Sequence, residues 1–181
     1  DLYQGFKGKA ERCVSERASA GKEKMINIQI IAIGSIKEKY LKEGISEYQK
    51  RLIPYVKIDV IEIKEEKLPE APSPAEIRNA LVAEAKRIRD KLPDDAYTIA
   101  LAIEGETISS EMFSLLIADI QNYHRGKVVF IIGGSYGLAD EIKQLAQKQL
   151  SFSRATFSHQ LMRLIFFEQL YRAFMIMRGK K

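Results

Sequence analysis

Strand-like and helix-like patterns of apolar residues alternate along the chain after its first 24 residues. Residues 26–33 are rich in aliphatic side chains, residues 56–63 alternate between apolar and polar side chains, and residues 97–103 and 128–132 are again apolar. Each run has the length and composition of a β-strand. A fifth strand-like piece lies within residues 150–160.

Between these strands, apolar residues recur at the three- to four-residue spacing that predicts helices. The clearest helix start is Ser73-Pro74, because serine caps free backbone amides and proline suits the first helical position. The alternation predicts a single α/β domain with a mostly parallel five-stranded sheet and helices on both faces. The predicted helices cover residues 37–52, 74–92, 109–120, 140–149 and 161–178.

The first 24 residues have neither an apolar core nor a regular periodicity, and Met25 follows them directly. We interpret residues 1–24 as a tag or an upstream extension, and residues 25–181 as the single domain. One cysteine excludes an intramolecular disulfide, and two distant histidines argue against a structural zinc site. The longest apolar runs have five residues, so we expect a cytoplasmic protein without a membrane span.

Charge is distributed unevenly along the chain. Residues 25–142 carry 15 basic and 19 acidic side chains, whereas residues 143–181 carry 8 basic side chains and one acidic side chain, Glu168. A basic C-terminal quarter would attract a polyanion. A solvated basic end without a function has the same pattern, so this feature leaves both interpretations open.

Three loops are predicted at the carboxyl edge of the sheet, where parallel α/β sheets bind their ligands. They are Glu104-Gly105, the glycine-rich segment 133–137 (GGSYG), and residues 152–157 (FSRATF), on which an adenine could stack. The glycines either let a ligand approach the backbone or serve only tight turns. The chain contains neither a dinucleotide-binding GxGxxG nor a P-loop sequence.

The last predicted helix is apolar on nearly all sides. A helix of this kind is buried all round, and a terminal helix in a single domain of this size usually keeps one free face. The second apolar side therefore predicts a partner subunit, most simply a homodimer.

Four segments carry a resemblance to a known family: residues 99–105 (IALAIEG), 130–138 (FIIGGSYGL), 150–163 (LSFSRATFSHQLMR) and 168–173 (EQLYRA). Together they resemble the RlmH-type ribosomal RNA methyltransferases of the SPOUT superfamily, over residues 25–181. The resemblance implies an S-adenosylmethionine-dependent enzyme that methylates N3 of a pseudouridine in 23S ribosomal RNA. It also implies a homodimer whose C-terminal half forms a trefoil knot, which sequence pattern alone does not reveal.

Two features depart from the family pattern. Ser158 stands where the family typically has proline, and the sequence ends at Lys181 without the Tyr-His-containing tail of its relatives. The net positive charge of the basic end is small for holding free RNA tightly, so we expect a structured target, such as an assembled ribosome.

The resemblance also implies which residues form the site. The implied methyl transfer needs no metal. The proton on N3 must leave, and Glu168 is the candidate acceptor, with Arg172 or Arg163 placing the base or a phosphate and His159 as a further candidate. The alternatives are an i,i+4 ion pair for Glu168 and Arg172, and capping or packing for His159. The implied cofactor contacts are Leu101, Gly133, Phe152, Ser153, Arg154, Ala155, Thr156 and Phe157.

Two other functions fit the same residues. One is a SPOUT methyltransferase with another RNA substrate, such as transfer RNA. The other is a non-catalytic nucleotide- or RNA-binding module that uses the same glycine-rich edge and basic end.

Overall fold

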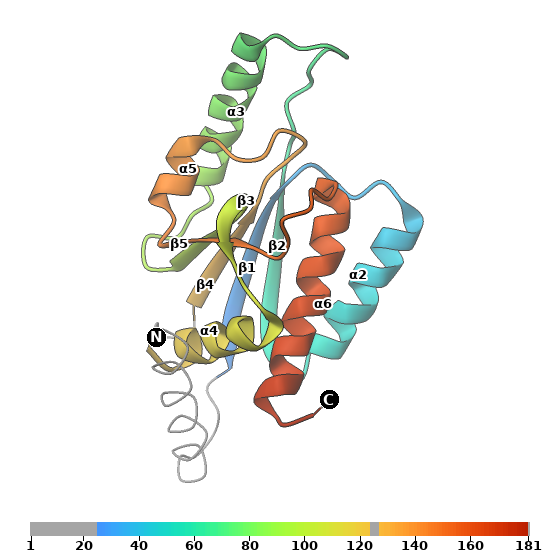
Figure 1. Cartoon of the computed structure of the whole chain (residues 1–181), viewed down its shortest axis with the longest axis vertical. Helices are drawn as coiled ribbons and strands as arrows, with labels where there is room; N and C mark the ends of the chain where they lie inside the picture. Colours follow the sequence, from blue (N-terminus) through green and yellow to red (C-terminus); the bar gives the residue numbers. More distant parts are fainter. Residues whose placement is uncertain (1–24, 124–126, 181) are drawn as a thin grey trace.

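The computed structural model describes residues 25–123 and 127–180. The predicted tag, residues 1–24, and His124 lie outside the described residues. The elements follow the predicted alternation of strands and helices (Figure 1). They are β1 (Ile26–Ile33), α2 (Lys39–Leu52), β2 (Val56–Ile63), α3 (Pro74–Arg89), β3 (Tyr97–Thr107), α4 (Ser110–Tyr123), β4 (Lys127–Ile132), α5 (Asp140–Leu145), β5 (Lys148–Ser151) and α6 (His159–Met177).

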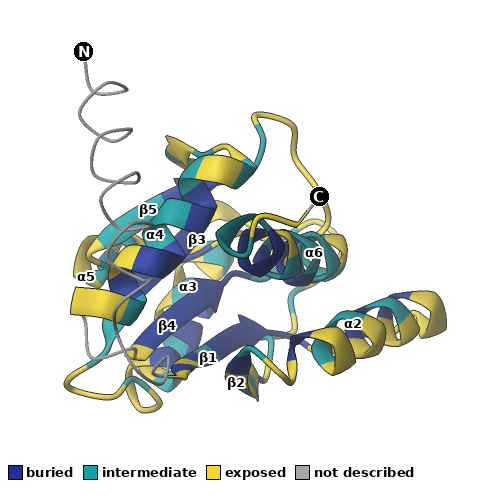
Figure 2. Ribbon diagram, turned by 90° about the horizontal axis from the view of Figure 1, so that it is seen from below, coloured by how far each residue is buried: buried dark blue, intermediate teal, exposed yellow. Residues whose placement is uncertain are grey.

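The five strands form one sheet in the order β2-β1-β4-β3-β5. All four strand pairs are parallel, which confirms the predicted parallel α/β sheet. The aliphatic runs of β1 and β4 are buried because these strands lie inside the sheet with both faces covered (Figure 2). The carboxyl ends of all five strands therefore point toward one edge.

Helices cover both faces of the sheet, as predicted. On one face, α2, α4 and α6 pack against side chains such as Ile28 and Ile30 of β1. On the other face, α3 and α5 pack against Ile31 and Ile33, the alternate residues of the same strand. The outer side of α2 is exposed (Figure 2).

Strand β3 runs to Thr107, so Glu104-Gly105, which was predicted as a loop, lies within the strand. Leu150 pairs both with Leu101 and with Glu106, because β3 bends away between these two residues and returns. Gly105 lies in the bend, where an added Cβ would be 2.7 Å from the backbone of Gln149 and Leu150, so only glycine allows this close approach. The trefoil knot that the resemblance implies stays a prediction.

The predicted helix over residues 140–149 is shorter than expected. It ends at Leu145, because Lys148–Ser151 is needed as the edge strand β5. The segment expected to be a strand over residues 150–160 contributes only its first residues to the sheet. The rest is a loop at the carboxyl edge.

Helix α6 is apolar on nearly all sides because it lies on the sheet with α2 and α4 against it. Phe166, Phe167 and Phe174 are fully buried, and Tyr171 packs against Tyr48 of α2. Much of the second apolar side, from which we predicted a partner subunit, is thus covered within the chain. None of the helices within the described residues has the length and hydropathy that a membrane crossing requires.

Candidate active site

A cavity of about 80 Å³ opens between the ends of β3 and β5. Its walls come from Leu101, Ala102 and Ile103 of β3, from residues 150–153 and 155–157, and from Met162 of α6. The structure thus gathers most of the predicted cofactor contacts around one space. Six of them line it: Leu101, Phe152, Ser153, Ala155, Thr156 and Phe157.

The loop over residues 152–157 takes its shape from short-range serine hydrogen bonds. The Ser151 hydroxyl donates to the Ser153 carbonyl over 2.7 Å, and the Ser153 hydroxyl accepts from the Ala155 amide over 2.9 Å. Such bonds fix turns without regular secondary structure. At the end of the loop, the Ser158 hydroxyl accepts from the Leu161 amide over 3.3 Å and caps α6. Serine therefore has its own structural use where the family has proline.

Two of the predicted cofactor contacts lie outside the cavity lining. Arg154 is exposed on the loop beside the cavity. Gly133 faces the other end of its own loop, since an added Cβ would lie 2.4 Å from the Gly137 carbonyl oxygen. The Gly137 amide also donates to the Gly134 carbonyl over 3.1 Å, and Gly137 has a φ of 81°. The glycines at 133 and 137 are therefore explained by the tight turn, the alternative weighed above.

Glu65, just beyond β2, is a site residue that sequence reasoning missed. Its Oε1 accepts hydrogen bonds from the Ser135 amide at 3.2 Å and the Ser135 hydroxyl at 2.9 Å. Burial alone would raise the pKa of Glu65, but these bonds, together with the positive charges of His159 and Lys37, lower the pKa below its ordinary value. A separate cavity of about 270 Å³ lies beside Glu65, with Ser135 and Tyr136 in its wall.

His159 begins α6 and lies near the same carboxylate. Burial lowers the pKa of its imidazole, the charge of Glu65 raises it, and the charges of Arg163 and Lys37 lower it again. The result is a pKa below the ordinary value for histidine. The imidazole is therefore neutral near pH 7 and able to accept a proton.

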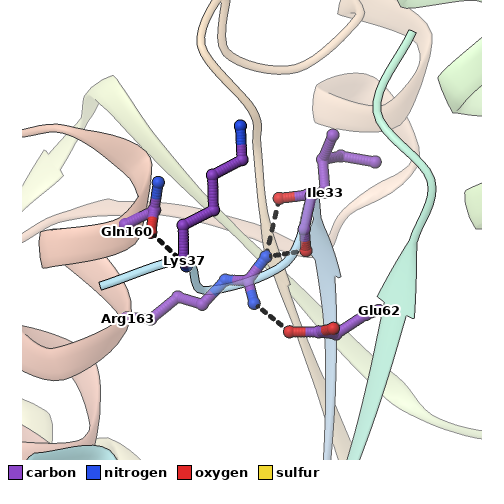
Figure 3. A network of polar contacts seen from close by, with 6 residues as sticks. Ile33, Lys37, Glu62, Gln160 and Arg163 are labelled. Atoms are coloured by element: carbon purple, nitrogen blue, oxygen red, sulfur yellow. Dashed lines mark hydrogen bonds and ion pairs between the residues drawn. The ribbon is translucent and has the colours of Figure 1, made fainter. Parts of the chain in front are cut away.

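Arg163 has a different role from the one expected. Its side chain is 3% exposed and forms an ion pair with Glu62 at 2.7 Å. It also donates to the carbonyl oxygens of Ile33, at 2.7 Å, and of Gly34 (Figure 3). The guanidinium thus joins α6 to the ends of β1 and β2. The prediction that Arg163 places a base or a phosphate is wrong for this chain, because its donors face the interior.

A second bond joins the same elements, and Figure 3 shows it beside Arg163. The Lys37 amide donates to the Gln160 side chain over 2.8 Å. The start of α6 is therefore fixed to the end of β1 and the segment after it at two points, Gln160 and Arg163. This sets the position of His159, which directly precedes Gln160.

Glu168 and Arg172 form the i,i+4 ion pair that was the alternative to a catalytic role. The Arg172 Nε donates to Glu168 Oε1 over 2.9 Å, and Gln169 donates to the other carboxylate oxygen over 2.6 Å. Glu168 lies about 9 Å along the helix axis from Met162, at a rise of ~1.5 Å per residue. Within one chain, the pair is therefore displaced from the cavity.

The described residues include no group of three or more His, Cys, Asp or Glu side chains arranged to hold a metal ion. Glu65 contacts the glycine-rich turn through Ser135, and His159 lies near the Glu65 side chain. The neutral imidazole of His159 can accept a proton in this arrangement.

A family model described as "Predicted SPOUT methyltransferase" matches residues 26–181. The chain belongs to the SPOUT methyltransferase family. It is 52% identical over 155 residues to the "Ribosomal RNA large subunit methyltransferase H" of Bacillus cereus, covering 86% of this chain and 98% of the relative. The protein of the same name from Listeria monocytogenes is 48% identical over the same shares.

Among solved structures, the SpoU methyltransferase AviRb from Streptomyces viridochromogenes, in complex with AdoMet, is similar to this SPOUT methyltransferase with a TM-score of 0.42 and 11% identity. The match covers 89% of this chain and 64% of AviRb. The family resemblance drawn from the four sequence motifs is confirmed by the family model and the two relatives.

Proposed function

We propose that this SPOUT methyltransferase uses S-adenosylmethionine to methylate N3 of a pseudouridine in 23S ribosomal RNA. The observation that carries the proposal is the identity of 52% over 98% of a relative whose name specifies the RNA of the large ribosomal subunit. The pseudouridine and the N3 position come from the resemblance of the four motifs to RlmH-type enzymes.

The cavity between β3 and β5 suits the cofactor. Its lining includes the apolar residues Leu101, Phe157 and Met162 and the polar residues Ser153 and Thr156. Apolar faces with a few polar groups are what a flat purine ring requires. We assign the adenine end of S-adenosylmethionine to this cavity, with the exposed Arg154 beside it.

S-adenosylmethionine supplies an electrophilic methyl group when it is bound. The chain must then hold the nucleophilic nitrogen in line and accept its proton. Within one chain, His159 is the candidate acceptor near the cavity, because Phe157 and Met162 on either side of it line the wall. Glu168 and Arg172 reach a substrate only if a second subunit brings them there.

We therefore propose a homodimer with a shared site, in which one subunit holds the cofactor and the other supplies Glu168 and Arg172. Mixing two inactive variants tests this arrangement. A Gly133→Ala subunit and an Arg172→Ala subunit would form heterodimers with one intact composite site, and activity would return. Heterodimers that form, as shown by native mass spectrometry, but stay inactive would contradict the shared site.

An assembled ribosome is the proposed target, because the basic C-terminal quarter offers few free charges. Arg163 is buried, Arg172 is paired with Glu168, and Lys143 is paired with Glu104 at 2.5 Å and Asp140 at 2.7 Å. Few free cations give weak binding to unstructured RNA. Shape recognition of a folded ribosomal surface would then supply the specificity.

Transfer of a labelled methyl group tests the function directly. Purified protein is incubated with methyl-labelled S-adenosylmethionine and with ribosomes, free 23S RNA or transfer RNA from cells that lack the enzyme. We expect label in ribosomes, at a modified pseudouridine after digestion to nucleosides. Label in transfer RNA would support the other SPOUT substrate, and cofactor binding without any transfer would support the non-catalytic module.

A further inference from the structure

One carboxylate, that of Glu65, contacts the glycine-rich turn at the end of β4. It accepts two hydrogen bonds from Ser135, one from the backbone and one from the hydroxyl. The turn begins beside the cavity, since Ile132 pairs with Leu101 and Leu101 lines the cavity wall. Glu65 therefore fixes the position of a segment that borders the proposed cofactor site.

Two glycines leave space for this carboxylate. An added Cβ at Gly134 would lie 3.0 Å from Glu65 Oε1, and one at Gly34 would lie 3.3 Å from Glu65 Oε2. Gly34 also has a φ of 78°, which favours glycine for a second reason. The close approach at both positions shows that the carboxylate lies against the ends of β1 and β4.

The same carboxylate faces the start of α6. The Cβ position at Gly34 that is 3.3 Å from Glu65 is also 3.5 Å from His159 Nε2. The two side chains therefore converge on one point, within electrostatic reach of each other. The other charges that act on His159 are those of Arg163 on α6 and of Lys37 after β1.

We propose that Glu65 is a positioning residue that acts on two borders of the site at once: it holds the glycine-rich turn by hydrogen bonds, and its charge acts on the imidazole of His159. His159 is two residues beyond Phe157 and three before Met162, both in the cavity wall. The inference rests on the proposed function, since it assigns the cofactor to the cavity and proton acceptance to His159.

The two actions of Glu65 are separable by substitution. In Glu65→Gln, the amide oxygen still accepts from Ser135, but the charge is gone. In Glu65→Ala, both are lost. In Ser135→Ala, one hydrogen bond is lost and the charge remains. Glu66→Gln is the matched control, because the neighbouring Glu66 pairs with Arg87 instead.

Two measurements are made on the full chain: calorimetric binding of S-adenosylmethionine, and the NMR titration of His159, with its resonance assigned by a His124→Gln variant. We expect Glu65→Ala to weaken cofactor binding about tenfold and Glu65→Gln less than about threefold, because glutamine keeps an oxygen that accepts from Ser135 and alanine keeps none. We expect the His159 pKa to fall in both Glu65 variants and to stay unchanged in Ser135→Ala and Glu66→Gln.

Thermal unfolding first establishes that each variant is folded. If Glu65→Ala does not fold, the isosteric Glu65→Gln variant still tests the proposal. The proposal is overturned if Glu65→Ala binds the cofactor as the wild type does, or if the His159 pKa does not move in Glu65→Gln. A wild-type protein that binds no cofactor would instead refute the proposed function, while the titration of His159 would still test its coupling to Glu65.

Discussion

Replacing Arg163 by leucine should destabilise the protein more than the same substitution at any exposed arginine. The guanidinium is buried, and it holds Glu62 and the carbonyls of Ile33 and Gly34 together at the carboxyl edge. Leucine is shorter than arginine and has no hydrogen-bond donors. The substitution would leave the two carbonyls without this partner and separate α6 from the ends of β1 and β2.

The size of the loss in unfolding free energy depends on which groups of the network become hydrated in the variant. Removing one partner of a fully buried ion pair costs about 3–5 kcal/mol. Glu62 is 45% exposed, so its carboxylate is resolvated in the variant. The remaining loss is that of the hydrogen bonds to the carbonyls, each worth about 1–2 kcal/mol. We expect a total of about 3 kcal/mol, or about 6–12 °C in Tm.

Urea unfolding at pH 7 measures this difference. The control is Arg89→Leu, because Arg89 is 54% exposed and pairs with Glu141 at 3.2 Å. An exposed pair of this kind contributes less than about 1 kcal/mol. If Arg163→Leu costs no more than the control, the buried network does not hold the edge together and the structural role assigned to Arg163 is refuted.

Three further outcomes follow from the same structure. Gly133→Ala should cost more than about 2 kcal/mol in urea and weaken cofactor binding over tenfold, because its Cβ would meet Gly137 at 2.4 Å. Gly137→Ala meets no atom within 4 Å and should cost only about 1 kcal/mol for its positive φ; equal effects would contradict this reasoning. Glu168→Gln should keep cofactor affinity but lower the methylation rate more than about tenfold. An unchanged rate would mean that Glu168 serves only as the ion-pair partner of Arg172. The hydrogen bond from Lys143 holds the pKa of Glu104 below its ordinary value of 4.5, so the stability it gives is present above that pH and is lost as pH falls through the lower folded value. Glu104→Gln should therefore flatten the loss of stability in acid, as measured by urea unfolding across pH.

The sheet and its helices were predictable from local pattern. The aliphatic run at residues 128–132 predicted a strand covered on both faces, and β4 lies inside the sheet with helices on each side. Periods of two and of about 3.6 residues are local properties, so a single sequence reveals them. The β3–β5 crossing is different, because Gly105 is explained only by the backbone of Gln149, 44 positions away in the sequence.

The site was predictable in part. The resemblance placed the 152–157 loop and Leu101 together, and both line one cavity. The role of Arg163 was not predictable, because helical spacing shows which side of the helix a residue lies on but not which elements cover that side. Glu65 gave no local signal, since its meaning depends on Ser135 and His159, which approach it only in the folded chain.

The nucleosides of ribosomal RNA from a strain that lacks this gene test the central claim most directly. Mass spectrometry of digested 23S RNA should show loss of the N3-methylated pseudouridine, with an unmethylated pseudouridine in its place. The wild-type gene should restore the methyl group and the Glu168→Gln gene should not. A 23S RNA with unchanged methylation in the deletion strain, or a methyl group lost from transfer RNA instead, would contradict the account.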